Sequence, residues 1–93
     1  MRSGEEINAE IKALEAIKPS VLRSSAFGDD HHAAIDAQLR VLREKMSDDR
    51  ISNFFGDDDS HYEYDSAMDA RRWLDGEYEG GASLAESWKE LVR

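Results

Sequence analysis

The residues best suited to bind a metal ion stand together between positions 29 and 36. Asp29, Asp30, His31 and His32 are consecutive, and Asp36 follows four residues after His32. In a helix this spacing places His32 and Asp36 on one face, where an imidazole and a carboxylate could share an ion. A dedicated site needs further ligands, and neither an H-E-x-x-H motif nor a cysteine pair supplies them. A solvated helix start with acids that favour the helix dipole explains the run better, so no metal or other cofactor is predicted.

A second acidic run, from Asp57 to Asp65, has carboxylates near alternate positions, as in a calcium loop. The EF-hand loop requires glycine at its sixth position and glutamate at its twelfth. Counted from Asp57, those positions hold Tyr62 and Met68, so the match fails. An acidic linker is the better interpretation.

Catalytic motifs are not evident in the sequence. It contains no cysteine nucleophile, no G-x-S-x-G elbow and no phosphate-binding loop. Its many carboxyl groups would serve as general acids only where burial raised their pKa. We therefore predict a protein that is not an enzyme and has no catalytic residues.

Net charge is the strongest functional signal. The chain has 12 Lys and Arg against 21 Asp and Glu, a net charge of -9. Residues 1–46 hold 7 basic and 8 acidic residues, a net of -1, whereas residues 47–93 hold 5 and 13, a net of -8. An acidic surface repels nucleic-acid phosphates and anionic membranes and attracts basic proteins. The predicted partner is therefore a basic protein surface, with no direct nucleic-acid or membrane binding.

Basic residues occur in two small groups, Arg71–Arg72 and Arg40–Lys45, each beside acids. A nucleic-acid-binding protein would show a basic stripe instead. We expect solvated helix faces with ion pairs four residues apart, such as Asp36 with Arg40.

Apolar spacing predicts helices throughout. Stripes at intervals of three and four run from Glu5 to Lys18 and through residues 30–46. Pro19 ends the first, because the residue before proline disfavours helical backbone. Asp29 or Asp30 caps the second through its carboxylate.

Three shorter helices are predicted in residues 47–93. The first follows a cap at Ser47, Asp48 or Asp49 and stops at Gly56. The next runs from about Tyr62 to Asp75, with Trp73 at the edge of its inward face and Gly76 as its stop. The last begins at Ser83, which fits a capping box with Glu86. No segment alternates like a strand, so the predicted fold is all-α, a compact bundle of four to five short helices in a single domain of residues 1–93.

The predicted contact surface lies in residues 47–79, where acidic loops alternate with aromatic-bearing helices. Most aromatic residues should lie in the core, but Tyr62 and Tyr78 fall in acidic loops, and exposed tyrosine favours protein contacts. The predicted partner-binding residues are Asp48, Asp49, Asp57, Asp58, Asp59, Tyr62, Glu63, Asp65, Glu77, Tyr78 and Glu79. Cysteine is absent and no apolar run approaches the ~20 residues of a membrane span, which favours the cytoplasm.

Three segments together resemble a known group of proteins. They are residues 27–38 (FGDDHHAAIDAQ), residues 70–76 (ARRWLDG) and the closing Ser83, Trp88 and Leu91-Val92. Over residues 9–93 the chain resembles small uncharacterised proteins of phages and other bacterial mobile elements. The resemblance carries no established activity or residue role. It implies a setting in which small acidic proteins block host defence, among them anti-CRISPR and anti-restriction proteins, some of which mimic DNA.

The leading hypothesis is a small acidic inhibitor that occupies a nucleic-acid groove on a bacterial protein or nucleoprotein complex. Carboxylates four residues apart on a helix lie about 5–6 Å apart at Cβ, comparable with phosphate spacing along a strand. One alternative is a non-enzymatic structural or regulatory homodimer. Another is weak metal binding at His31, His32 and Asp36.

Overall fold

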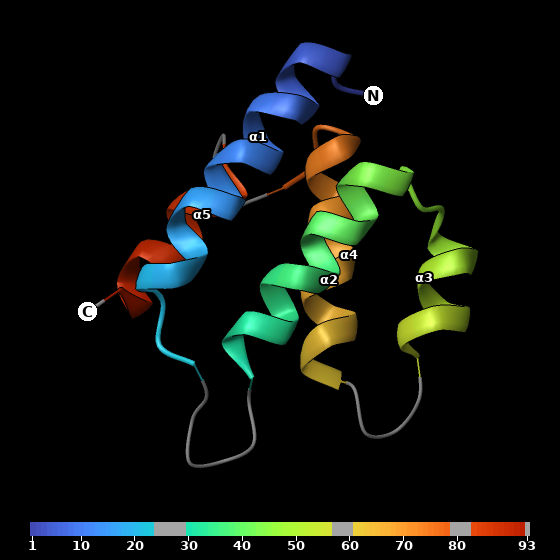
Figure 1. Cartoon of the computed structure of the whole chain (residues 1–93). Coiled ribbons are helices and arrows are strands. Elements are labelled where there is room, and N and C mark those ends of the chain that lie inside the picture. Colours follow the sequence, from blue (N-terminus) through green and yellow to red (C-terminus); the bar gives the residue numbers. More distant parts are fainter. Residues whose placement is uncertain (24–29, 57–60, 79–82, 93) are drawn as a thin grey trace.

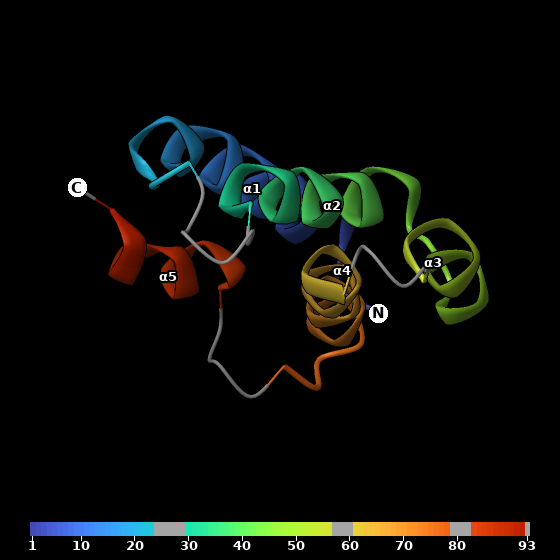
Figure 2. The same ribbon diagram turned by 90° about the horizontal axis from the view of Figure 1, so that it is seen from below.

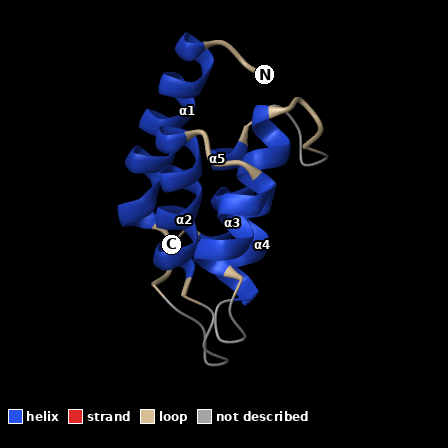
Figure 3. Cartoon of the chain, turned by 90° about the vertical axis from the view of Figure 1, so that its right-hand side faces the viewer, coloured by secondary structure: helices blue, strands red, loops and turns tan. Residues whose placement is uncertain are grey.

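The computed structural model describes residues 1–23, 30–56, 61–78 and 83–92. In these residues the chain forms five α-helices and two short 3₁₀ segments, η1 and η2, with no strand (Figure 3). The elements are α1 (Gly4–Ile17), η1 (Lys18–Ser20), α2 (His31–Glu44), α3 (Asp48–Phe55), α4 (His61–Leu74), α5 (Leu84–Trp88) and η2 (Lys89–Leu91). The predicted all-α bundle of short helices is confirmed. None of the described helices is both long enough and apolar enough to span a bilayer.

Helices α2 and α4 form the centre of the bundle (Figure 1). They lie side by side and run in the same direction, with α3 as the return between them. Helix α1 packs on α2, and α5 packs on both α1 and α4. Seen from below, α1 and α2 make one layer over α5, α4 and α3 (Figure 2). Helix α2 belongs to one layer and α4 to the other, so the contact between them joins the two layers.

Local signals fix where the helices start and stop. Asp30 caps α2, with its carboxylate accepting from the amides of His32 and Ala33 at 3.1 and 3.2 Å. Ser47 caps α3 by accepting from the Arg50 amide at 3.2 Å. Gly76 follows α4 at a φ of 79°, a left-handed conformation that glycine adopts without steric cost. These predicted boundaries are confirmed.

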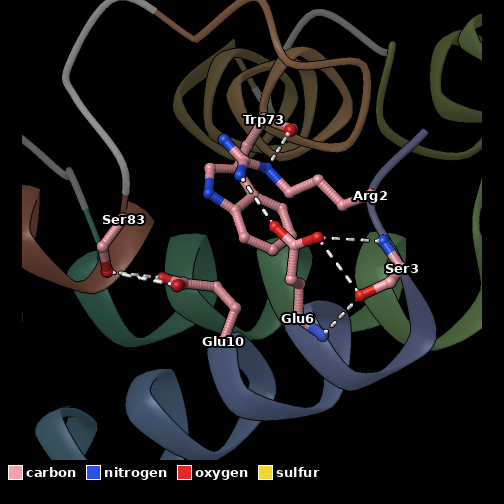
Figure 4. Close-up of polar contacts among 6 residues, drawn as sticks. All are labelled: Arg2, Ser3, Glu6, Glu10, Trp73 and Ser83. Atoms are coloured by element: carbon pink, nitrogen blue, oxygen red, sulfur yellow. Dashed lines mark hydrogen bonds and ion pairs between the residues drawn. The ribbon is translucent and has the colours of Figure 1, made fainter.

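The start of α1 is tied to the end of α4 (Figure 4). Ser3 and Glu6 form a capping box. The backbone amide of Ser3, then its hydroxyl and the Arg2 guanidinium, lower the pKa of Glu6. Arg2 also donates from Nε to the Trp73 carbonyl at 2.7 Å and lies over the Trp73 ring, 4.3 Å from its centroid. This cover explains why Trp73 is only 2% exposed, so its predicted place at the edge is wrong.

Small side chains are buried on both of the central helices, which pack on each other. Ala34 and Ala37 of α2 and Ala67 and Ala70 of α4 are all buried. Side chains this short let two helix backbones approach closely. A long polar side chain, Gln38 of α2, is also buried, with 3% of its surface exposed, and it contacts α4.

Gln38 joins three helices through its amide. Its Nε2 donates to the Ser66 carbonyl of α4 at 3.1 Å, and its Oε1 accepts from Trp88 Nε1 of α5 at 2.8 Å. The amide thus uses both a donor and an acceptor inside the core, which removes the cost of burying it.

Helix α5 is capped by a residue of α1 rather than by its own sequence. Glu10, only 7% exposed, accepts from the Ser83 hydroxyl at 2.8 Å and from the Ala85 amide at 2.9 Å. The predicted capping box of Ser83 with Glu86 is wrong, because Ser83 donates to Glu10 and Glu86 pairs with Lys89 at 2.9 Å. Within the described residues, every buried polar side-chain atom has a partner.

Replacing Gln38 with leucine should destabilise the protein by roughly 1–3 kcal/mol, because the buried Trp88 indole N–H loses its acceptor. Urea unfolding measures this free energy. Asp36→Ala on the exposed side of the same helix should cost less than about 1 kcal/mol, as exposed ion pairs do. The double variant Gln38→Leu/Trp88→Phe should cost less than the sum of its single changes. Additive losses would contradict the contact.

The end of α2 holds a strained residue. Lys45 has a φ of 50° and is the one non-glycine residue of the described chain with a positive φ. Its position closes a Schellman-type turn, in which the Met46 amide donates to the Val41 carbonyl at 3.2 Å. The left-handed conformation costs a side chain with a Cβ roughly 1–2 kcal/mol.

Lys45→Gly should therefore raise the free energy of unfolding by about 1 kcal/mol. Thermal and urea unfolding measure the gain. Lys45→Ala is the matched control, since it removes the charge but keeps the Cβ, and it should give no comparable gain. Equal stabilisation by both substitutions would show that the lysine charge, and not the backbone, is responsible.

Candidate partner-binding surface

Helix α4 divides the predicted acidic surface into two parts. Asp65, Asp69 and Arg72 follow one another at spacings of four and three, so they share one side of α4. Tyr64 and Arg71 lie on a different side, which faces α3. There the Tyr64 hydroxyl lies 3.4 Å from Ser52 Oγ. Arg71 donates to the Met46 carbonyl at 3.3 Å.

Asp48 and Asp49 belong to the part at α3. Both are exposed in the first turn of α3, where carboxylates favour the helix dipole. Because α3 packs on the Tyr64 side of α4, these two acids are separated from Asp65. The sequence placed all three in one surface, and the structure does not bring them together.

The second part, here called the α4 acidic side, consists of Asp65, Asp69, Arg72, Glu77 and Tyr78. The last four line one small pocket. Asp69 pairs with Arg72 at 2.5 Å. The chain turns back over α4 at Gly76, where the Glu77 amide donates to the Arg72 carbonyl at 2.8 Å. This turn is what brings Glu77 and Tyr78 beside the helix.

Glu63 lies apart from the α4 acidic side. It is half-buried and three residues before the buried Ser66, on the side of α4 that faces the core. The other predicted acids, Asp57, Asp58, Asp59 and Glu79, lie outside the described residues.

Tyr62 and Tyr78 are not exposed in the way their acidic neighbours suggested. Both are half-buried and pack against the core. The Tyr62 hydroxyl lies 2.7 Å from His31 Nδ1, and its ring meets Trp88 edge-on with centroids 6.4 Å apart. The Tyr78 hydroxyl is hydrogen-bonded to Ser87. Both rings are therefore largely structural, because neighbouring helices offer their hydroxyls partners.

Ion pairing leaves an excess of carboxylates on this half of the chain. Each arginine between residues 47 and 78 has a carboxylate partner: Arg50 with Glu44, Arg71 with Asp75, and Arg72 with Asp69. Among the described residues, no ion pair uses the acids Asp48, Asp49, Glu63, Asp65 and Glu77. These five carboxylates therefore form no direct ion pair within the described fold.

The candidate metal ligands are directed to separate partners. His32 Nε2 donates to the Val21 carbonyl at 3.0 Å, and His31 contacts Tyr62. Asp36 pairs with Lys18 at 2.6 Å, while Arg40 pairs with Glu44 at 2.9 Å, so the predicted pair of Asp36 with Arg40 is wrong. In the described part of the chain, no three His, Asp or Glu side chains are grouped to hold a metal ion. Asp29 lies outside that part.

One exposed aromatic residue was missed by the sequence patterns. Phe54 is 52% exposed, and the Arg40 guanidinium lies over its ring, 3.9 Å from the centroid. Ile51 and Phe55, four residues apart, already supply the buried stripe of α3. Phe54 lies off that stripe, and this position could have predicted from the sequence that its side chain is exposed.

Comparison of the chain with protein-family models, with curated proteins and with solved structures finds no match. The functional interpretation therefore depends on the chemistry of the surface.

Removing the Tyr62 hydroxyl tests its structural role. Tyr62→Phe should lower the free energy of unfolding by about 1 kcal/mol, the usual loss for one hydrogen bond. Tyr64→Phe is the matched control one half-turn away, and its longer 3.4 Å contact should contribute less. Chemical denaturation compares the two. A neutral Tyr62→Phe would contradict this structural role of the Tyr62 hydroxyl.

Proposed function

We propose that this protein is a non-enzymatic, acidic binding protein that docks on a basic, nucleic-acid-binding surface of another protein. The observation that carries the proposal is the set of carboxylates in the second half of the chain that form no ion pair with another described residue. On the α4 acidic side, Asp65 and Glu77 take part in no ion pair among the described residues, and Asp69 pairs with Arg72.

The geometry of this side supports a nucleic-acid-like role. Asp65 and Asp69 are four residues apart on one helix, so their Cβ atoms lie about 5–6 Å from each other, a distance comparable with that between neighbouring phosphates. A protein groove that binds nucleic acid presents Lys and Arg at such spacings and releases counterions when an anion enters. Carboxylates held on a rigid helix can occupy the same groove without large loss of side-chain freedom.

The resemblance to small proteins of phages and mobile elements defines the partners to test. In such a setting we propose inhibition of a bacterial defence system, with a CRISPR effector complex or a restriction nuclease as the basic partner. The protein would act by excluding nucleic acid from the groove, not by chemistry of its own.

The test is displacement of labelled duplex DNA from purified CRISPR effector complexes and restriction nucleases. We expect the protein to release the DNA at low salt and to lose affinity as salt rises, because screening weakens contacts between charges. Asp65→Lys/Glu77→Lys should weaken binding by roughly tenfold or more, since charge reversal places like charges across the contact.

The matched control is Glu5→Lys/Glu90→Lys. It changes the net charge equally, at two exposed acids outside the α4 acidic side. It should bind almost as well as the unmodified protein. Equal losses in the two double variants would show a response to total charge only. Absence of displacement at low salt would exclude the proposed mechanism for the partners tested.

A further inference from the structure

The α4 acidic side contains a small pocket that an arginine of the chain itself helps to line. Its walls are Asp69, Arg72, Glu77 and Tyr78. The pocket has a volume of about 280 Å³. Sites that hold whole small molecules usually have roughly 300–1,000 Å³. A cavity at the lower limit of that range suits one side chain of a partner better than a free ligand.

The two neighbouring arginines of α4 are held very differently. The Arg71 side chain is 19% exposed, binds the Asp75 carboxylate through both Nε and Nη2 at 3.2 and 3.0 Å, and donates to the Met46 carbonyl. The Arg72 side chain is 54% exposed and pairs with Asp69 through Nη2 at 2.5 Å. An exposed ion pair of this kind adds little to stability, so an incoming cation can compete for its carboxylate.

The chemistry of the pocket suits a guanidinium. Asp69 and Glu77 supply two carboxylates, and Tyr78 supplies an aromatic ring whose hydroxyl is hydrogen-bonded to Ser87. A guanidinium is planar, donates two parallel hydrogen bonds to a carboxylate, stacks on aromatic rings and is more weakly hydrated than an ammonium group. The pair of Asp69 with Arg72 is an example of this contact within the chain. The pocket therefore favours arginine over lysine.

We propose that Arg72 is an internal counter-ion of the α4 acidic side, and that an arginine of the docking partner replaces it at Asp69. The inference rests on the proposed function and identifies the group that the pocket receives. The pocket has two carboxylates and one guanidinium, so a docking cation meets a like charge as well as its two acceptors. Like charges that face each other across a contact weaken it. Arg72 therefore lowers the affinity for a basic partner until it is displaced from Asp69.

Binding of a nona-arginine peptide to the purified protein tests this inference without a defence complex. Isothermal titration calorimetry measures the affinity, and the NMR shifts of the Asp69 and Tyr78 amides locate the peptide. We expect Arg72→Gln to bind the peptide about two- to fivefold more tightly, because no internal pair has to be broken. Arg72→Lys keeps the charge and should bind much as the unmodified protein does. Nona-lysine should bind more weakly than nona-arginine.

Arg43→Gln controls for total charge. Arg43 is 51% exposed and pairs with Glu15 in the layer of α1 and α2 (Figure 2), so its loss changes the net charge equally at a distant place. It should leave the affinity for the peptide nearly unchanged. Equal gains in Arg72→Gln and Arg43→Gln, a weaker Arg72→Gln, or no binding of nona-arginine at low salt would each overturn the inference.

The peptide experiment and the displacement of DNA give separate answers. Tighter binding of nona-arginine by Arg72→Gln, together with no displacement of DNA, would count against the proposed function and leave the pocket as an arginine site. Displacement of DNA by the unmodified protein, without a gain in Arg72→Gln, would count against the role of Arg72 alone.

Discussion

The hydrogen bonds of the Gln38 amide are the contacts on which the arrangement of the helices depends. A buried amide must satisfy a donor and an acceptor at once, and here the two partners belong to different helices, α4 and α5. In a core of low dielectric constant, leaving a polar group unpaired is costly. Any other position of α5 would leave the Gln38 amide and the Trp88 indole unpaired and is therefore disfavoured. The Glu10 carboxylate adds a second fixed point, since it binds the start of α5 from α1. Apolar packing alone would hold these helices together but would fix their relative positions less strictly, because it is not directional.

The helices could be predicted because their signals are local. The apolar stripe of α2, the caps at Asp30 and Ser47 and the stop at Gly76 are each contained within a few neighbouring residues. The partner of Ser83 could not be predicted, because Glu10 is 73 positions away and resembles the other acids of α1 in sequence. Glu86 has the spacing of a local capping box with Ser83, but Ser83 binds the distant Glu10 instead.

The candidate surface shows the same division between local and distant information. Counting charges located the acidic excess in the second half of the chain, and the described fold shows which carboxylates in that half form no ion pair with another described residue. Sequence spacing could not show that α4 separates Asp49 from Asp65, or that the Tyr62 and Tyr78 rings turn toward the core. These facts depend on which side of α4 each neighbouring segment packs, and that is decided by contacts between helices.

The wide sequence separation of the polar contacts has a consequence for the order of folding. Glu10 meets Ala85 across 75 positions, and Gln38 meets Trp88 across 50. During synthesis the first helices emerge before these partners exist, so the carboxylate and the amide remain hydrated and the early helices pack loosely. Closing such long loops is slow relative to forming local turns. Docking of α5 is then the step that completes the core, and a nascent chain interrupted before Trp88 stays open to proteolysis.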